Sequence, residues 1–397
     1  MKPSGIEWIG DIPDDWEVTK IGQLYLERNE KVSDREYEAL SVTKHGILKQ
    51  LESAAKTDNG DNRKLVKSGD FVINSRSDRR GSCGISKFDG SVSLINIILM
   101  PTQKIANGYY NYLFRTENFA DEFYKYGNGI VDDLWSTKWT SMKKILVPFP
   151  SLRTQQRIAD YLDEKCGEID ATISKQKESI EKLKAYKQSL ISETVTKGLD
   201  KSAPLKPSGI KWLGEIPQNA RIIRLRFLSS IQTGDKDTVN RVENGKYPFY
   251  VRSPIVERID TFSFDGEAIL MAGDGVGAGK VFHYVNGKFD YHQRVYNIHN
   301  LKGVLGKFLY YYLRENFYKE IEQSNAKSTV DSIRLPMLLD FPIIVYPYDL
   351  QKAMVSFLDK KVAEIDAIII KKQNIIQKLD AYKKSLIFEC VTGKQKI

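Results

Sequence analysis

The sequence has few of the residues that build metal, disulfide or nucleophile sites. Its 397 residues include three cysteines and four histidines. Cys83, Cys166 and Cys390 form no C-x-x-C pair, and none lies near a cluster of histidines. An odd number of widely spaced cysteines supports neither a disulfide framework nor a zinc site. We therefore expect no metal on this chain.

Long hydrophobic runs are also missing. The longest apolar stretches, such as 93–100 and 341–346, are far shorter than the roughly 20 residues of a membrane-spanning helix. The chain opens with a polar, mixed segment that lacks the basic-then-apolar order of a signal peptide. These features predict a cytoplasmic protein.

Sequence motifs for catalysis are lacking as well. There is no Asn-Pro-Pro-aromatic or Asp-Pro-Pro-aromatic motif, no Pro-Asp…Glu-x-Lys nuclease pattern, and no suggestion of a Ser/His/Asp set. The loop from Gly273 to Lys280 resembles a phosphate-binding loop, but Asp274 and Val281 occupy positions that require Gly and Ser or Thr. We predict a protein that is not an enzyme, and keep an enzyme that uses this loop as an alternative.

Positive charge is in excess. The formal net charge is +9 and the pI is about 9.1. A basic balance favours a polyanionic partner, most often nucleic acid.

An internal repeat organises the whole chain. Residues 206–217 repeat residues 2–13 with nine of twelve identities, and residues 358–394 repeat residues 162–198 without gaps and with 21 of 37 identities. The segments between these blocks have diverged, and the second copy is eight residues shorter there. One frame that holds two dissimilar inserts suggests two different targets on one scaffold.

The rear block of each copy predicts a long helix. Residues 152–196 contain no proline, and apolar residues recur at the three-four spacing of a heptad seam. At about 1.5 Å per residue such a helix is roughly 65 Å long. The predicted seam residues are Ile169, Ile173, Ile180, Leu183, Leu190, Ile365, Ile369, Ile376, Leu379 and Leu386.

A narrow apolar stripe needs a partner, and the nearest is the helix of the other copy. Two equivalent units related by a pseudo-twofold axis would pair their helices antiparallel. Packing of each helix on its own domain is the alternative. We therefore predict an α+β fold: two mixed α/β domains joined by two long helices in an antiparallel coiled coil, with pseudo-twofold symmetry.

The inserts combine short strands with aromatic helices. Residues 69–74 and 266–271 predict a turn and a strand at equivalent places, and residues 109–125 and 306–323 predict helices whose aromatics belong to the core. A polar loop follows each strand, at 74–82 and at 272–280.

Side-chain chemistry in the diverged parts indicates candidate DNA contacts. Arg binds guanine bidentately and Asn or Gln binds adenine, whereas Lys and Ser commonly bind phosphates. Each could instead be an ordinary surface residue. The candidates are Lys44, His45, Ser75, Arg76, Arg79, Arg80, Lys138, Thr233, Lys236, Arg252, Lys280, Gln293, Arg294, Lys327 and Arg334.

The frame resembles a known family. The segment VPFPSLRTQQRIADYLD at 147–163, the tail LKAYKQSLI at 183–191 and the front PSGIEWIG at 3–10 followed by Trp16 are similar to the specificity subunit of Type I restriction–modification systems. The second copy departs from this pattern, with Ala220 in place of Trp16 and Lys352 in place of the second Gln.

The resemblance implies a division of the chain and a set of partners. Target-recognition domains would occupy 1–150 and 199–346, and helical regions 151–198 and 347–397. Each domain would recognise half of a bipartite, asymmetric site in double-stranded DNA, while the helices set the spacer and dock two methyltransferase subunits.

It further implies that motor–nuclease subunits join the complex. S-adenosylmethionine, ATP and Mg²⁺ would bind those partners, with no cofactor on this chain. A coiled-coil scaffold whose globular parts bind protein is the competing hypothesis.

Overall fold

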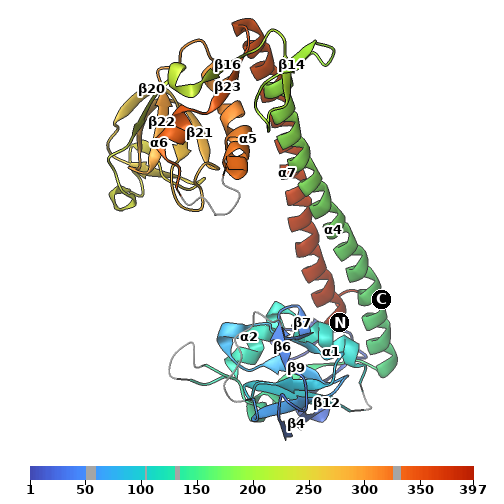
Figure 1. The fold of residues 1–397 in the computed structure, drawn as a ribbon. Helices are drawn as coiled ribbons and strands as arrows, with labels where there is room; N and C mark the ends of the chain where they lie inside the picture. Colours follow the sequence, from blue (N-terminus) through green and yellow to red (C-terminus); the bar gives the residue numbers. More distant parts are fainter. Residues whose placement is uncertain (51–59, 103–104, 130–134, 325–331) are drawn as a thin grey trace. The chain divides into compact units, whose positions relative to one another are not determined.

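Both predicted long helices are present in the computed structural model of the protein, which describes residues 1–50, 60–102, 105–129, 135–324 and 332–397. The first, α4, spans Leu152–Lys197, and the second, α7, spans Tyr348–Val391 (Figure 1). Gly198 and Gly393 follow their ends with positive φ angles, a backbone conformation that favours glycine at a helix C-terminus. In the described part of the chain, no helix is long and apolar enough to cross a membrane.

Contacts between residues divide the chain into two units. Unit 1 contains residues 1–176 and 373–397, and unit 2 contains residues 177–372. Each unit thus combines one globular part with a segment of α4 and a segment of α7. The four-segment division drawn from the resemblance remains a prediction.

The globular part of unit 1 consists of small antiparallel sheets and short helices. Its main sheet has the strand order β10-β9-β12-β4, beside sheets β11-β8-β5, β6-β7, β13-β3 and β1-β2. The strands are β1 Lys2–Pro3, β2 Asp11–Ile12, β3 Glu17–Lys20, β4 Tyr25–Arg28, β5 Lys31–Val32, β6 Leu40–Thr43, β7 Gly46–Lys49, β8 Arg63–Val66, β9 Phe71–Asn74, β10 Cys83–Ile85, β11 Gly90–Val92, β12 Asn96–Pro101 and β13 Leu146–Phe149. The helices are α1 Asn107–Phe114, α2 Glu117–Lys125 and α3 Trp139–Met142.

Unit 2 has a larger sheet of six strands, in the order β17-β22-β20-β21-β18-β19, with pairs β16-β23 and β14-β15. The strands are β14 Leu205–Pro207, β15 Glu215–Pro217, β16 Arg221–Arg224, β17 Ser230–Thr233, β18 Tyr247–Tyr250, β19 Val256–Ile259, β20 Phe264–Ala272, β21 Phe282–Tyr291, β22 Val295–His299 and β23 Pro342–Val345. The helices are α5 Gly306–Ser324 and α6 Leu335–Leu339. The predicted strands at 69–74 and 266–271 correspond to β9 and β20.

One helix prediction is wrong in detail. The segment 109–125 forms two helices, α1 and α2, rather than one. Thr116 separates them because its buried side chain accepts a hydrogen bond from the Phe119 N–H and caps α2. In unit 2 the equivalent α5 is continuous.

The aromatic side chains of these helices form the cores, as predicted. Tyr110, Phe114 and Phe123 are buried in unit 1, and Phe308, Tyr312 and Phe317 are buried in unit 2. The same core of unit 1 includes Leu162 from α4 and Val391 from α7. Each domain is therefore packed against both helices. The apolar stripe thus has both predicted partners, the other long helix and a globular domain.

Within each unit, the two helices pair antiparallel. In unit 1, Ile169, Ile173 and Leu386 are buried, and Ile376 and Leu379 pack partly buried against the same core. In unit 2, Ile180, Ile365 and Ile369 are buried, whereas Leu183 and Leu190 are half-buried. This places every predicted seam residue away from full exposure.

Two ion pairs explain why Lys187 and Lys383 interrupt the apolar stripe. Lys383 Nζ lies 2.6 Å from a carboxylate oxygen of Asp170 in unit 1, and Lys187 Nζ lies 2.6 Å from Asp366 in unit 2. The repeat relates Lys187 to Lys383 and Asp170 to Asp366. Each lysine therefore pairs with the aspartate of the other copy.

Candidate nucleic-acid interface

The loops after β9 and β20 occupy equivalent places in the two domains. In unit 1, Arg76 forms a β-bridge with Ser136, and the Thr137 N–H donates to the Ser75 carbonyl at 3.0 Å. In unit 2, Asp274 forms the matching bridge with Ser332, and the Ile333 N–H donates to the Gly273 carbonyl at 2.7 Å. A distant segment thus closes over each loop in the same way.

In unit 1 this closure brings three candidate residues together. Ser75, Arg76 and Lys138 line one open pocket of about 480 Å³. The Arg76 backbone is fixed on both sides: its N–H donates to Asn74 Oδ1 at 3.1 Å, and its carbonyl accepts from the Tyr124 hydroxyl at 2.8 Å. Lys138 is exposed and precedes the first turn of α3.

Lys64 belongs to the same pocket and was not among the sequence candidates. Its ammonium donates to the Asn96 carbonyl at 2.9 Å and lies 3.9 Å from Glu27. Burial lowers the pKa of Lys64, and Glu27 partly opposes that shift. Leu94 and Ile95 also line the pocket and are exposed apolar side chains. A lysine in a strand gave no local signal, because only its tertiary neighbours place it here.

The other basic residues of the first loop are divided. Arg79 is exposed and lies 3.5 Å from its neighbour Asp78, at the end of a short 3-10 helix, Ser77–Arg79. Arg80 pairs with Asp121 of α2, so its charge is already compensated. Arg79 is the more exposed of the two and is therefore better placed for an external phosphate.

Lys44 and His45 lie in a different part of unit 1. They form the exposed turn between β6 and β7, where Arg115 donates to the Lys44 carbonyl at 3.1 Å. His45 lines another pocket of unit 1, of about 760 Å³, beside Asp163 and Asp170 of α4. The structure therefore does not bring these two residues to the pocket of Ser75, Arg76 and Lys138.

In unit 2 the equivalent loop is the centre of a charged cluster. Arg252 Nη1 lies 3.1 Å from one oxygen of Asp274, and Arg294 Nε lies 3.7 Å from the other. Arg334 precedes α6 and is exposed, at the place that Lys138 occupies before α3. Asp274 is not among the sequence candidates, all of which have side chains that can donate hydrogen bonds.

A second set of candidates lies at the ends of β17, β21 and β22. The Gln293 N–H donates to the Lys236 carbonyl at 2.8 Å, and its side chain donates to Asp237 Oδ2 at 2.8 Å. Buried His292 joins both sets, because its Nδ1 accepts from the Arg294 N–H at 2.9 Å. Burial, followed by the nearby Arg252 charge, lowers the pKa of His292. Thr233 is exposed at the end of β17.

The glycine-rich loop 273–280 has a structural explanation. A Cβ on Gly277 would lie 2.4 Å from the Arg252 carbonyl, and one on Gly273 would lie 2.9 Å from the Tyr296 ring. The loop leads into strand β21 rather than a helix, unlike a phosphate-binding loop. Lys280 sits over the Tyr318 ring, 4.2 Å from its centroid. The glycines allow close packing around Arg252, and Lys280 lies against α5.

Lys327 lies outside the described residues.

Three loops of unit 2 end in exposed apolar side chains. Val239, Ile255 and Val276 are 86%, 71% and 99% exposed. They lie within three residues of Lys236, Arg252 and Asp274. Exposed aliphatic tips beside charged side chains suit contact with a partner surface that offers both charge and apolar patches.

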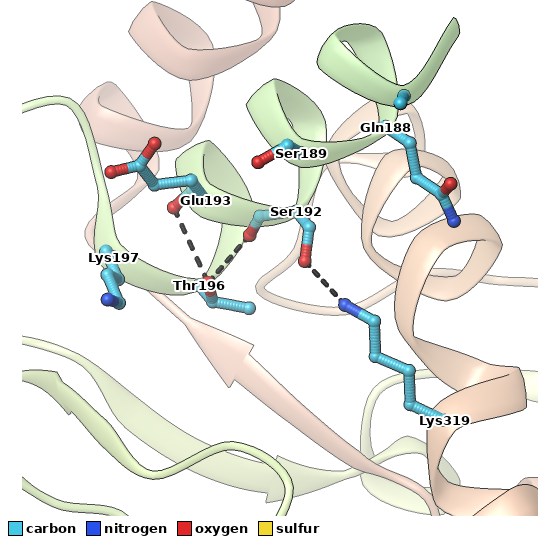
Figure 2. A pocket seen from close by; sticks show the side chains of 8 residues that line it. Gln188, Ser189, Ser192, Glu193, Thr196, Lys197 and Lys319 are labelled. Atoms are coloured by element: carbon cyan, nitrogen blue, oxygen red, sulfur yellow. Dashed lines mark hydrogen bonds between the residues drawn. The ribbon is translucent and has the colours of Figure 1, made fainter. Parts of the chain in front are cut away.

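A polar groove in unit 2 has a structural role. It has a volume of about 470 Å³ and is lined by α4 residues, together with Lys319 of α5. Figure 2 shows Lys319 reaching Ser192, whose hydroxyl accepts at 2.7 Å. This contact ties α5 to α4, and we assign the groove no ligand.

The family model described as the Type I restriction modification DNA specificity domain matches residues 13–184 and 222–379. The chain belongs to this family of specificity subunits. It is 25% identical over 425 residues to the MjaVIII specificity subunit of Methanocaldococcus jannaschii, covering 97% of this chain and 94% of that one. It is 27% identical over 181 residues to the EcoDI specificity subunit of Escherichia coli, a match that spans 46% of this chain and only 40% of that relative.

Solved structures share the fold. A chain from a study of complex assembly and conformational transition of the type I R-M system has a TM-score of 0.76 at 13% identity, covering 97% of this subunit and 100% of that chain. The HsdS subunit from Thermoanaerobacter tengcongensis has a TM-score of 0.55 at 14% identity, covering 97% and 98%.

The structure of the specificity subunit also accounts for its second-copy departures. Gln155 and Gln351 are buried, and each bridges its domain to its helix: Gln155 accepts from the Ala106 N–H at 2.9 Å and donates to the Pro150 carbonyl at 2.8 Å. Gln351 does the same with Leu305 and Tyr346, both at 2.8 Å. The position that differs, Gln156 or Lys352, is exposed.

In unit 2, a tyrosine that follows the partner strand takes the place of the missing tryptophan. Trp16 and Pro150 precede and follow the paired strands β3 and β13, and Ala220 and Tyr346 hold the matching positions beside β16 and β23. Trp16 packs edge-on against Tyr109, with ring centroids 6.4 Å apart. In unit 2, the buried Tyr346 donates to the Thr196 carbonyl at 2.8 Å. A large aromatic is kept in both copies, on opposite strands.

Proposed function

We propose that the specificity subunit recognises a bipartite, asymmetric site in double-stranded DNA, one half through each loop that follows β9 or β20. One observation carries the proposal: equivalent loops, closed by equivalent bridges, present different chemistry. Unit 1 offers Ser75, Arg76 and Lys138, whereas unit 2 offers Arg252 and Arg294 around Asp274. Two dissimilar interfaces on one frame suit two dissimilar half-sites.

The side chains fit the grooves of DNA. Arginine and glutamine are the residues that bind guanine and adenine edges, and lysine and serine bind phosphates. The exposed valines and isoleucine of unit 2 suit the methyl group of thymine, which is apolar and lies in the major groove. The net charge of +9 supports attraction to the DNA backbone.

The two long helices are proposed to set the spacer between the half-sites and to dock two methyltransferase subunits. Outside the seam, most positions of α4 are exposed and polar, which leaves a surface for partners. On this proposal the chain is non-catalytic. S-adenosylmethionine would bind the methyltransferase subunits, and ATP and Mg²⁺ would serve motor–nuclease subunits that join the complex.

The test uses the subunit assembled with its methyltransferase partners. Sequencing of methylated sites in cells that carry the system would give the target, and binding to that duplex would then be measured against salt. We expect affinity to fall steeply with salt, with a preference for the target over unrelated duplex at every salt concentration. Absence of DNA binding by the assembled complex would favour the protein-binding scaffold instead.

A further inference from the structure

The two recognition loops carry opposite charge at one equivalent position. Arg76 in unit 1 and Asp274 in unit 2 follow matching strands and form matching β-bridges. An acidic residue at the centre of a surface proposed to bind a polyanion is unfavourable by itself, because it repels phosphate. Its presence there therefore indicates a role other than binding phosphate.

Asp274 is placed to hold two arginines. Its two oxygens face Arg252 Nη1 at 3.1 Å and Arg294 Nε at 3.7 Å. The aspartate side chain is 22% exposed, whereas the arginine side chains are 45% and 63% exposed. A guanidinium has five N–H donors. The carboxylate thus engages one nitrogen of each arginine and leaves both exposed heads with donors for a ligand.

The backbone around the cluster is equally fixed. Gly277 lets the loop approach the Arg252 carbonyl, and the Gly273 N–H donates to the Arg294 carbonyl at 2.8 Å. The Arg294 N–H donates to buried His292. Both arginines therefore start from anchored main chain, and Asp274 lies against one side-chain nitrogen of each.

We propose that Asp274 is a positioning residue, which orients Arg252 and Arg294 to bind guanine in the half-site recognised by unit 2. The inference rests on the proposed DNA recognition. A free arginine side chain loses much rotamer freedom on binding, and pre-orientation lowers that entropic cost. A pair this exposed contributes little to folding, so orientation is the larger effect.

The test is Asp274→Asn in the complete methyltransferase complex, with the methylated motif read by sequencing. The half-site of unit 2 is identified beforehand by exchanging residues 199–346 for those of a relative. We expect discrimination for guanine in that half-site to fall at least about fivefold, as for loss of a bidentate contact. Binding to unrelated duplex should stay equal or rise, because a negative charge is removed.

Asp340→Asn is the matched control. Asp340 also lies between two arginines, 2.9 Å from Arg224 and in contact with Arg226, and it is 42% exposed. The control should leave both half-sites unchanged. If Asp274→Asn fails to fold, Arg252→Gln and Arg294→Gln separately replace it, and each should weaken guanine discrimination in the same half-site.

The outcomes separate the two hypotheses. If the wild-type complex shows no sequence preference, the proposed function is wrong. If it shows one that lacks guanine in the half-site of unit 2, or if Asp274→Asn leaves that guanine preference intact, the positioning role is overturned while DNA recognition stands. Equal loss in Asp274→Asn and Asp340→Asn would likewise overturn it, as a general effect of charge.

Discussion

Gln155 and Gln351 show how one buried side chain can join three segments of a domain. Each amide accepts a hydrogen bond from a backbone N–H near the start of an aromatic helix and donates to the carbonyl at the end of a strand. Both residues lie in the first turn of their long helix. The amide therefore fixes where the helix leaves the domain.

We predict that Gln155→Leu destabilises unit 1 by about 2–4 kcal/mol, because it leaves the Ala106 N–H and the Pro150 carbonyl buried without this partner. Gln156→Lys, which copies the second repeat at the neighbouring exposed position, should change stability by less than about 0.5 kcal/mol. Chemical denaturation of both variants measures the difference. Equal stabilities would mean that the buried amide does not hold the join.

Residue identity alone could not assemble the candidate interface. Side-chain chemistry indicates Ser75, Arg76 and Lys138 one by one, but the bridge between Arg76 and Ser136 that unites them is a tertiary pairing. Selection for hydrogen-bond donors also omits Asp274, whose proposed contribution is to position other residues. The same selection included Lys44 and His45, which lie on a separate hairpin.

At the scale of elements, each helix pairs with the other copy through a lysine within an apolar seam. The side chains of Lys187 and Lys383 are 17% and 27% exposed, and their aspartate partners are 44% and 59% exposed. Partial burial favours a well-defined pairing, and the symmetric exchange of partners sets one register for both units. The lysines thus specify which residues of the two helices face each other.

A double-mutant cycle on Lys187 and Asp366 should give a coupling of up to about 1 kcal/mol, the upper range for pairs that keep some contact with water. The intrahelical pair Lys184–Glu181, more exposed at 53% and 71%, is the control and should couple by about 0.3–0.5 kcal/mol or less. Stability is measured by denaturation of the four variants of each cycle. A coupling no larger than the control would show that the pair does not define the register.

Sequence periodicity predicted the long helices well because repeat identity, missing proline and heptad spacing all agree over more than 40 residues. It predicted α1 and α2 poorly because the break between them depends on the capping hydrogen bond of Thr116. In the sequence, this threonine looks like any other polar residue in a helical pattern. The sheets were harder still. The six-stranded order of unit 2 depends on pairings between distant segments, including the parallel contact of β18 with β21, that leave no local pattern.

At the scale of the whole molecule, acid should affect the two units differently. Burial lowers the pKa of His283, His292 and His299, all in unit 2, below the ordinary value of 6.5. The unfolded chain therefore takes up protons first as pH falls through about 6.5, so unit 2 loses stability towards the lower folded-state pKa values. Well above pH 6.5 these histidines are neutral in both the folded and the unfolded chain, so this loss of stability is absent.

Hydrogen exchange at pH 7.5 and 5.5, corrected for the intrinsic rate, should show a larger loss of protection in unit 2 than in unit 1. The variant with His283→Gln and His299→Gln should reduce that difference. An equal response of both units, or no effect of the double substitution, would contradict the assignment to these histidines.

The proposed role of the helices as a spacer gives a geometric prediction. Insertion of one heptad into both α4 and α7, within the seam, should lengthen the unread spacer of the DNA site and leave the half-site sequences unchanged, because a heptad keeps the seam in phase. Sequencing of methylated sites measures both. Insertion into α4 alone is the control and should impair assembly, since the helices would no longer match. Altered half-sites in the matched variant would rule out the spacer role.

The exchanged ion pairs also have a consequence for how such a gene can change over time. Asp170 and Lys383 are far apart in the sequence and belong to different copies, yet a substitution at one removes the ion pair unless the other changes to match. The same holds for Lys187 and Asp366. These positions should therefore covary between the copies among relatives, while the recognition loops drift independently. The duplicated halves are free to diverge in what they bind, but they remain tied to each other along the seam.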